Sequence, residues 1–407
     1  MRFINNQRGV AILIAIFAMV ICVIIATEIS YETQVQYVSS AQAVNRLKAY
    51  YAAKAGAELS LFRILIYKKV MAQFGKQLKD NKNILDIIWQ FPFSWPPVGT
   101  DSLSTFDQDA LKTIIKESTM DAQYMATIES EGGKIDINDL ASESKPLATG
   151  VRAQIFQIFK NEIDNNKVFK KKYDTFDFEK LVNNIQDWVD EDKISLNGGD
   201  ESIKYKQPDG VKNYFLPPNA PFKTIEELHM VDGVEEEFFD LLKDKITVYG
   251  TKGINVNYAT EPVLKSLDPQ IKDEALDWII KRRGDPNLGG PFKDFDDFYN
   301  FLESKNVRTE NMRKSELPLL FDAEYNFRVT SSGQYANVRR EVIAITYDID
   351  GLTGKYAEML DKTAADKNSA PDDTNKTPPP ASPSDKSSSD TIKIPKGRPT
   401  VVFWQES

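Results

Sequence analysis

One long uncharged apolar block stands near the N-terminus of the chain, behind a short basic peptide. Residues 10–26 contain no charged side chain and no proline, and as an α-helix they span about 26 Å. That length suffices for one tilted or slightly thinned crossing of a lipid bilayer. The sequence therefore predicts a single membrane anchor at 10–27, followed by a folded body on one side of the membrane.

The charges beside the apolar block favour one orientation. Arg2 and Arg8 precede the block, whereas Glu28 and Glu32 follow it. Because positively charged residues tend to stay on the cytoplasmic side, we expect the N-terminus in the cytoplasm and the body on the other side.

A small residue, Gly9, lies directly before the apolar block and not after it. The cleavage site of an ordinary signal peptide follows its apolar region, whereas a cut after Gly9 would leave the helix attached, with Val10 as the new N-terminus. This layout resembles that of prepilins and pseudopilins. The resemblance implies removal of a leader, 1–9, by a prepilin peptidase, and methylation of Val10. The alternative is a plain signal anchor that happens to contain Arg-Gly.

The fifth position of the mature chain departs from the usual pilin pattern. Most pilins carry a glutamate there, which meets the N-terminal amine of a neighbouring subunit, but this chain has Ile14. An ionised carboxylate in a bilayer needs such a partner, so a subunit without it cannot offer the usual pairing to a subunit above it. In this the chain resembles the K-type minor pseudopilins of type II secretion, GspK, which are placed at the filament tip.

The composition limits the chemistry of the body. Cys22 is the only cysteine and lies in the apolar block, and His229 is the only histidine. An intrachain disulfide and a zinc site of thiolate and imidazole ligands are therefore excluded. The net charge of −9 argues against a nucleic-acid surface. The sequence shows no nucleophile–base set and no glycine-rich phosphate loop, so we expect no enzyme.

Beyond the membrane block the helix is expected to continue. No Pro or Gly interrupts 27–55, and apolar residues then recur in steps of three and four, which mark one face of an amphipathic helix. These residues are Val44, Leu47, Tyr51, Ala55, Leu59, Phe62 and Ile66. We predict one helix from Val10 to about Lys76, with its second half packed on a sheet.

Alternating and β-branched residues predict strands in two regions. The four segments are 126–129, 134–138, 325–330 and 338–347. Gly132-Gly133 is the expected turn of the first pair, and 332–334 that of the second. The residues between the two regions have the pattern of helices and loops. The predicted fold class is α+β, a long helix on an antiparallel sheet. The pilin-like body is 28–138 and 323–350, and a mainly helical insertion at 139–322 interrupts it.

Four short strings carry a resemblance to the K-type family. They are Gly133–Asn138, Asp187–Asp192, Asn219–Leu228 and Ile254–Ala259. Each is weak alone, but their order and the prepilin-like start without glutamate together identify the chain as similar to K-type pseudopilins. The resemblance covers nearly the whole chain except about 351–390.

The resemblance implies a structural subunit at the tip of the type II secretion pseudopilus, where it initiates or caps assembly for protein export across the outer membrane. The implied partners are the I-type and J-type minor pseudopilins, the prepilin peptidase and the secretion machinery, without nucleic acid. The implied location is the inner membrane of a Gram-negative cell, with a periplasmic body. Two alternatives stay open. They are a minor tip pilin of a type IV pilus, for adhesion or DNA uptake, and a membrane-anchored periplasmic enzyme.

A turn at Val231–Val234 resembles that of a helix-hairpin-helix (SAM-like) element, since Gly233 permits the tight bend. Six acidic residues crowd the turn and would repel phosphates. They are Glu226, Glu227, Asp232, Glu235, Glu236 and Glu237. We therefore interpret the motif as a scaffold for protein contacts. A second helical pair is expected at 275–283 and 294–302.

An acidic stretch, 187–201, offers several hard oxygens that suit Ca²⁺. Its spacing departs from the EF-hand, because Ser195 stands where that loop has glycine. The resemblance implies a calcium site with Asp190, Asp192 and Glu201 as ligands, and Asp187 and Asp200 are further candidates. Ser202 replaces an acid that is usual in the family. The alternative is a solvated acidic loop.

Residues 361–390 are rich in Ser, Pro and charge and contain no large apolar side chain. Such a segment cannot bury enough apolar surface to order itself, so we predict a disordered loop. The apolar residues that follow, including Trp404, predict a final strand at 399–405.

Overall fold

The computed structural model describes most of the chain. The described residues are 7–78, 84–98, 105–205, 217–315, 317–349, 352 and 397–407. Most of the predicted leader and the predicted loop at 361–390 lie outside them.

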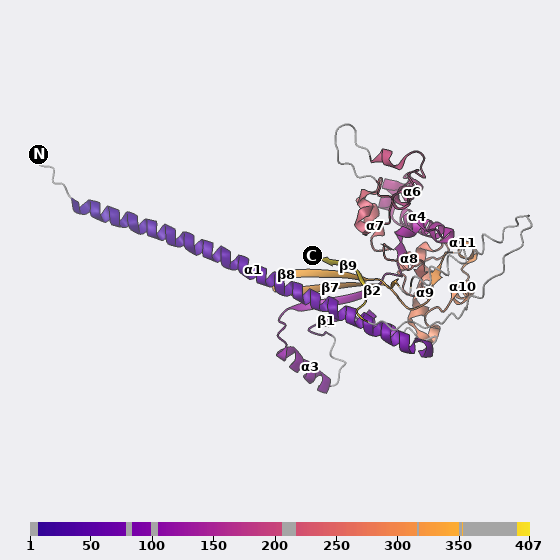
Figure 1. The fold of residues 1–407 in the computed structure, drawn as a ribbon, viewed down its shortest axis with the longest axis horizontal. Helices are drawn as coiled ribbons and strands as arrows, with labels where there is room; N and C mark the ends of the chain where they lie inside the picture. Colours follow the sequence, from indigo (N-terminus) through magenta and orange to yellow (C-terminus); the bar gives the residue numbers. More distant parts are fainter. Residues whose placement is uncertain are drawn as a thin grey trace, which may run out of the picture.

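The longest element is helix α1, Gln7–Leu78, which confirms the predicted continuous helix. Its first half projects from the rest of the molecule, and its second half crosses the sheet (Figure 1). The large side chains between Val10 and Ile25 are exposed. Within α1, Val10–Gly75 contains a stretch long and apolar enough to cross a membrane, judged by length and composition.

A five-stranded sheet with the order β1-β2-β7-β8-β9 lies against α1. The strands are β1 (Phe93–Trp95), β2 (Gln123–Ser130), β7 (Phe327–Tyr335), β8 (Val338–Thr346) and β9 (Val401–Glu406). All neighbours are antiparallel. Strands β2 and β7 are distant in sequence but pair directly, for example at Thr127 and Thr330. The α+β pilin-like fold is therefore confirmed.

The face of α1 that packs on the sheet is not the predicted apolar face. Small residues meet the sheet along the first part of this face, where Ala49, Ala52, Ala53, Gly56 and Ala57 are buried. Larger side chains follow and are buried in the same core, namely Leu61, Ile64, Tyr67 and Met71. The predicted apolar face points away from it. Its members Val44, Leu47, Tyr51, Phe62 and Ile66 are 36–58% exposed, and we call them the outer stripe. The small side chains let the helix backbone approach the sheet closely in the first part of the inner face.

One predicted turn and one predicted strand pairing were wrong. Residues 332–334 lie inside β7, and the hairpin turns instead at Ala336 and the residue after it, with Ala336 at φ 51°. The expected pair of β2 with 134–138 does not form. Instead Ile135–Asp136 (β3) pairs in parallel with Ile246–Thr247 (β4). The buried Ile135 and Ile246 join the core of the insertion, which outweighs a local hairpin.

The insertion is mainly helical and sits near the C-terminal end of α1 (Figure 1). Its helices are α4 (Lys145–Asn165), α5 (Lys167–Tyr173), α6 (Phe178–Val189), α7 (Glu236–Leu242), α8 (Glu261–Ser266), α9 (Asp273–Gly284), α10 (Phe295–Ser304) and α11 (Glu310–Ser315). Its 3₁₀ turns are η3 (Ile137–Ala141), η4 (Glu201–Lys204), η5 (Ile225–Met230) and η6 (Pro286–Leu288). Two short strands, β5 (Ile254–Asn255) and β6 (Leu319–Leu320), pair in parallel. Outside the insertion lie the helices α2 (Ile87–Gln90) and α3 (Thr105–Glu117).

Aromatic side chains fill much of the core of the insertion. Phe159 of α4 stacks on Phe178 of α6 at 4.6 Å, and both contact Phe238 of α7. The predicted turn at Val231–Val234 joins η5 to α7, with Gly233 at φ 86°. The first of these two elements is a 3₁₀ helix, not an α-helix.

A buried polar contact joins the insertion to the body. Glu131, which follows β2, is fully buried. Its carboxylate accepts hydrogen bonds from Thr247 of the insertion and from Arg328 of β7. Lys134 lies 3.2 Å from it. Nearby, the Asn326 side chain donates to the Tyr249 carbonyl at 2.9 Å. We call Glu131, Thr247, Arg328, Asn326 and Tyr249 the seam.

Candidate metal site

The candidate site lies just beyond the C-terminal end of α6. This helix is strongly amphipathic, and it ends because Asp190 takes an extended conformation while its N–H still bonds the Gln186 carbonyl. The loop that follows is closed by a bridge between Ile194 and Asp200. Glu201 then begins η4. The loop therefore returns Glu201 to the end of α6.

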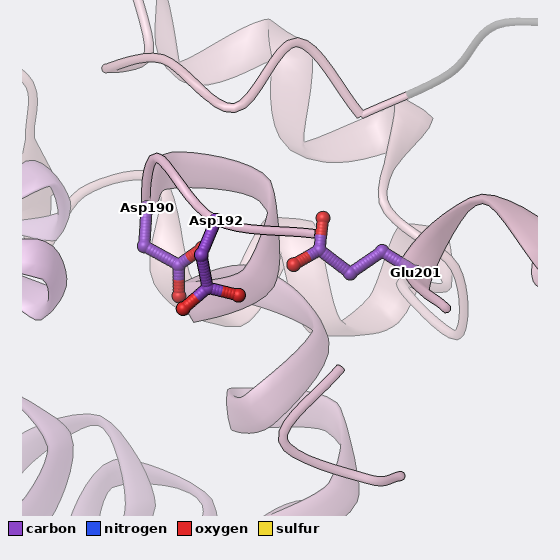
Figure 2. Close-up of side chains that lie close together, drawn as sticks. All are labelled: Asp190, Asp192 and Glu201. Atoms are coloured by element: carbon purple, nitrogen blue, oxygen red, sulfur yellow. The ribbon is translucent and has the colours of Figure 1, made fainter. Parts of the chain in front are cut away.

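Three predicted ligands come together there. Asp190, Asp192 and Glu201 each offer a carboxylate oxygen, and these three oxygens lie within 4.8 Å of one another. Figure 2 shows Glu201 reaching toward the two aspartates from the opposite side. Asp190 Oδ1 and Glu201 Oε1 are buried without a hydrogen-bond partner among the described residues. Two unsatisfied carboxylate oxygens in one cluster cost free energy that a bound cation would remove.

Burial and neighbouring charges raise the pKa values of two carboxyl groups in the cluster. Burial raises the pKa of Asp190 to about 7, and the neighbouring Asp192 and Glu201 carboxylates add to the shift. Burial also raises the pKa of Glu201, while a hydrogen bond from Asn219 acts in the opposite direction. Burial is the larger cause of both pKa shifts, and repulsion between the carboxylates adds to it.

The structure places the two less certain candidates, Asp187 and Asp200, outside this group of three oxygens. Asp187 is buried and accepts hydrogen bonds from the Ser195 hydroxyl at 2.7 Å and the Leu196 N–H at 2.9 Å. Asp200 accepts from the Ser202 N–H at 2.8 Å and from its hydroxyl. In this structure both carboxylates shape the loop, and their roles as ligands stay predictions.

One residue at the cluster was not predicted as a site residue. The Asn219 side-chain nitrogen contacts the Asp192 carbonyl oxygen and lies 2.9 Å from Glu201 Oε2. Asn219 begins one of the strings that carried the family resemblance, but its distance in sequence from the acidic loop hid its place in space.

The donor set fits a hard divalent cation. The three acidic side chains of the cluster each offer a carboxylate oxygen, and irregular sets of oxygen ligands suit Ca²⁺, which takes six to eight of them. Mg²⁺ demands near-ideal octahedral geometry, and zinc favours the nitrogen and sulfur ligands that this cluster lacks. The ligands of the cluster therefore suit calcium better than magnesium or zinc.

Fold and sequence together define the class of the protein. A long apolar helix whose second half packs on an antiparallel sheet is the architecture of a pilin-like subunit. Two family models match the chain, the first domain of "Type II secretion system (T2SS), protein K" at residues 133–251 and "Type II secretion system (T2SS), protein K" at 254–318. The chain belongs to this family. It is a minor pseudopilin of the type II secretion system, and the family is structural, not enzymatic. Neither match favours the type IV pilus alternative. With α1, the family fits a membrane-anchored single-pass protein.

Among solved structures, a chain in the crystal structure of the GspK-GspI-GspJ complex from the type 2 secretion system of enterotoxigenic Escherichia coli is similar to this one. The identity is 17% and the TM-score is 0.41, over 57% of this chain and 76% of that chain. No curated protein matches the chain.

Proposed function

We propose that this minor pseudopilin occupies the tip of the pseudopilus, where it initiates or caps the filament for protein export across the outer membrane. The observation that carries the proposal is the place of the insertion. It adds bulk near the end of α1 that lies away from the apolar half (Figure 1), where a subunit above this one in the filament would lie. Ile14 in place of the usual glutamate points the same way.

We further propose that the outer stripe of α1 binds the helices of the I-type and J-type minor pseudopilins. The stripe runs from Val44 to Ile66, about 33 Å along the helix, and its side chains are spaced for packing against another helix. An exposed apolar surface of this length is unusual for a monomer and marks an interaction site.

The location and processing follow from the same proposal. The leader 1–9 is removed by the prepilin peptidase, Val10 becomes the methylated N-terminus, and the anchor lies in the inner membrane with the body in the periplasm. Mass spectrometry of the mature protein tests this. An intact Met1, or a cut beyond Ala26, would contradict it.

Tip placement is tested by immunogold labelling of pseudopili assembled with this protein. We expect label at one end of each filament. We also expect the full-length protein, extracted in detergent, to co-purify with the I-type and J-type subunits. Label distributed along the filament would exclude a tip role.

Calcium is the proposed ligand of the acidic cluster, where it would have a structural role. Asp190, Asp192 and Glu201 would hold the ion, whose charge offsets their mutual repulsion. The two buried unpartnered oxygens, Asp190 Oδ1 and Glu201 Oε1, support the proposal. Because Glu201 lies beyond the loop, the ion would tie the end of α6 to η4.

The test is the melting temperature of the full-length protein in detergent, with calcium and with chelator. At free calcium about 100 times the dissociation constant, binding to the folded state alone adds about 2.7 kcal/mol of stability. Asp190→Ala with Asp192→Ala should abolish the difference. The control is Asp164→Ala with Asp277→Ala, two exposed acids on other helices, which should retain it. Equal melting temperatures in the unmutated protein would reduce the cluster to a solvated loop.

A further inference from the structure

A second segment of the insertion closes one side of the acidic cluster. Asn219 reaches it with its side-chain amide, whose nitrogen contacts the Asp192 carbonyl oxygen and Glu201 Oε2. The segment around Asn219 is anchored nearby. The Phe222 ring lies parallel to that of Trp188 at 6.2 Å, and the Phe222 N–H donates to the Asn138 side chain at 2.7 Å. The amide is therefore held at the cluster by the fold.

Glu201 supplies a second, independent observation. It is 3% exposed, and its Oε1 atom has no hydrogen-bond partner among the described residues. A carboxylate buried to this degree without a cation is costly. A neutral amide donates a hydrogen bond to one of its oxygens but brings no positive charge. The Asn219 amide thus leaves the charge of Glu201 unbalanced, and a cation bound beside the amide would balance it.

The Asn219 amide can serve the cluster both without and with a bound cation. An asparagine side chain ends in one oxygen and one NH₂ group, which exchange places by rotation of the amide. Facing carboxylates alone, the NH₂ group is the favourable end. Facing a cation, the oxygen is the favourable end. Calcium takes amide and backbone carbonyl oxygens as ligands as well as carboxylates.

The backbone also favours asparagine at this position. Asn219 has φ 47°, in the left-handed region that asparagine enters more readily than most other residues with a side chain. The amide thus reaches the cluster with little backbone strain.

We propose that Asn219 is a further calcium ligand through its side-chain oxygen, so that the ion binds two segments of the insertion, 190–201 and 217–222, to each other. This inference rests on the proposed calcium function. Occupation of the site turns the amide and replaces its hydrogen bonds to Asp192 and Glu201 by a shared bond to the ion. Calcium then fixes the approach of Phe222 to Trp188 as well as the acidic loop.

The experiment is calorimetric titration of calcium into chelator-stripped, full-length protein in detergent. Asn219→Gly removes the amide without penalising the left-handed backbone, and should weaken affinity about tenfold or more. Asn219→Asp keeps the shape and an oxygen and adds charge, and should tighten binding, because the charge of the ligands sets calcium affinity. Asn306→Gly is the matched control, since Asn306 is an exposed asparagine with φ 61° outside the cluster. Its affinity should equal that of the unmutated protein.

The calcium affinity of Asn219→Asp shows whether Asn219 is a calcium ligand or only a hydrogen-bond donor. If Asn219 serves only by donating hydrogen bonds, the new carboxylate repels Glu201 and weakens binding, which overturns the inference. Unchanged affinity in both Asn219 variants also overturns it, while leaving the calcium site itself intact. If the unmutated protein binds no calcium, the proposed metal function and this inference fail together.

Discussion

Gly333 lies where α1 crosses β7, and the helix backbone occupies the place of its missing side chain. A Cβ atom there would lie 2.1 Å from the Ala49 carbonyl oxygen and 2.3 Å from the Ala53 nitrogen. Both neighbours are backbone atoms and cannot rotate away. On the facing helix, a Cβ atom at Gly56 would lie 2.3 Å from the Ser331 hydroxyl. These two glycines set the distance between helix and sheet.

We predict that Gly333→Val destabilises the protein by about 1–3 kcal/mol, because it overpacks the contact. The measurement is the melting temperature of the full-length protein in detergent. Gly284→Ala is the control, since nothing lies within 4 Å of a Cβ atom there, and it should change stability by less than about 0.5 kcal/mol. A Gly333→Val variant as stable as the control would show that the helix can move off the sheet without cost.

Asp86 is a buried carboxylate, and the described residues place no cation against it. It accepts hydrogen bonds from the Tyr258 hydroxyl at 2.7 Å and the Trp89 ring N–H at 3.2 Å. Burial nevertheless raises its pKa from 3.8 to about 6. The folded state therefore holds this proton more tightly than the unfolded state does.

The expected consequence is a pH dependence of stability. The contribution of Asp86 is fully present below about pH 4 and is lost as the pH rises through about 6. Asp86→Asn keeps the shape and an acceptor oxygen, so it should remove the contribution of Asp86 to the fall in the free energy of unfolding between pH 4 and 6. The measurement is the free energy of unfolding against pH, with Asp109→Asn, an exposed acid on α3, as the control. An unchanged slope in Asp86→Asn would exclude Asp86 as the source.

At the scale of elements, α1 serves two purposes with two faces. Its inner face carries small residues up to Ala57 and larger ones from Leu61 to Met71, and it packs on β7 and β8, while the outer stripe stays exposed. A stripe that contributes little to folding of the body is available for a partner helix.

We predict that Leu47→Asp and Phe62→Asp change the stability of the isolated protein by less than about 0.5 kcal/mol, since both side chains are exposed. The same variants should lose co-purification with the partner pseudopilins. Arg46→Asp is the control. Arg46 is exposed too, but the helical period places it on the side of α1 opposite the stripe. Normal co-purification of the two stripe variants would exclude the stripe as the interface.

At the scale of the whole molecule, the seam holds the insertion on the body. Glu131 directly follows β2 and Arg328 lies on the neighbouring strand β7, and Thr247 reaches Glu131 from the insertion. Glu131 has partners in both the body and the insertion, so a substitution at Glu131 or its partners affects how the insertion is held on the body.

We predict that Arg328→Ala destabilises the protein by about 3 kcal/mol, because it leaves Glu131 buried with less counter-charge. This loss of stability lies at the low end of the range for removing one partner of a buried ion pair, since the Lys134 amine remains 3.2 Å from the Glu131 carboxylate. Arg339→Ala on β8 removes an exposed ion pair and should cost under about 1 kcal/mol. Hydrogen exchange at 245–250 would show whether the insertion loosens. Equal stability of the two variants would contradict a structural role for the seam.

The sequence alone determined the features that depend on neighbours along the chain. The apolar run of 10–26 and the uninterrupted helical spacing after it specify α1, since helix formation is governed by contacts three and four residues apart. Asp190, Asp192 and Glu201 were expected from the resemblance that the acidic stretch 187–201 bears to K-type pseudopilins, and the structure brings the three together.

Only the tertiary structure decided what depends on distant residues. Periodicity located the outer stripe of α1 but not the face that meets the sheet, because that choice rests on the close approach at Gly333. The partner of Ile135 is Ile246 and not a residue of β2, since burial in a shared core outweighs a local turn. Asn219 reaches Glu201 from beyond an intervening segment. Such contacts form between residues far apart in sequence, where packing and burial select the partner and the local pattern carries no signal.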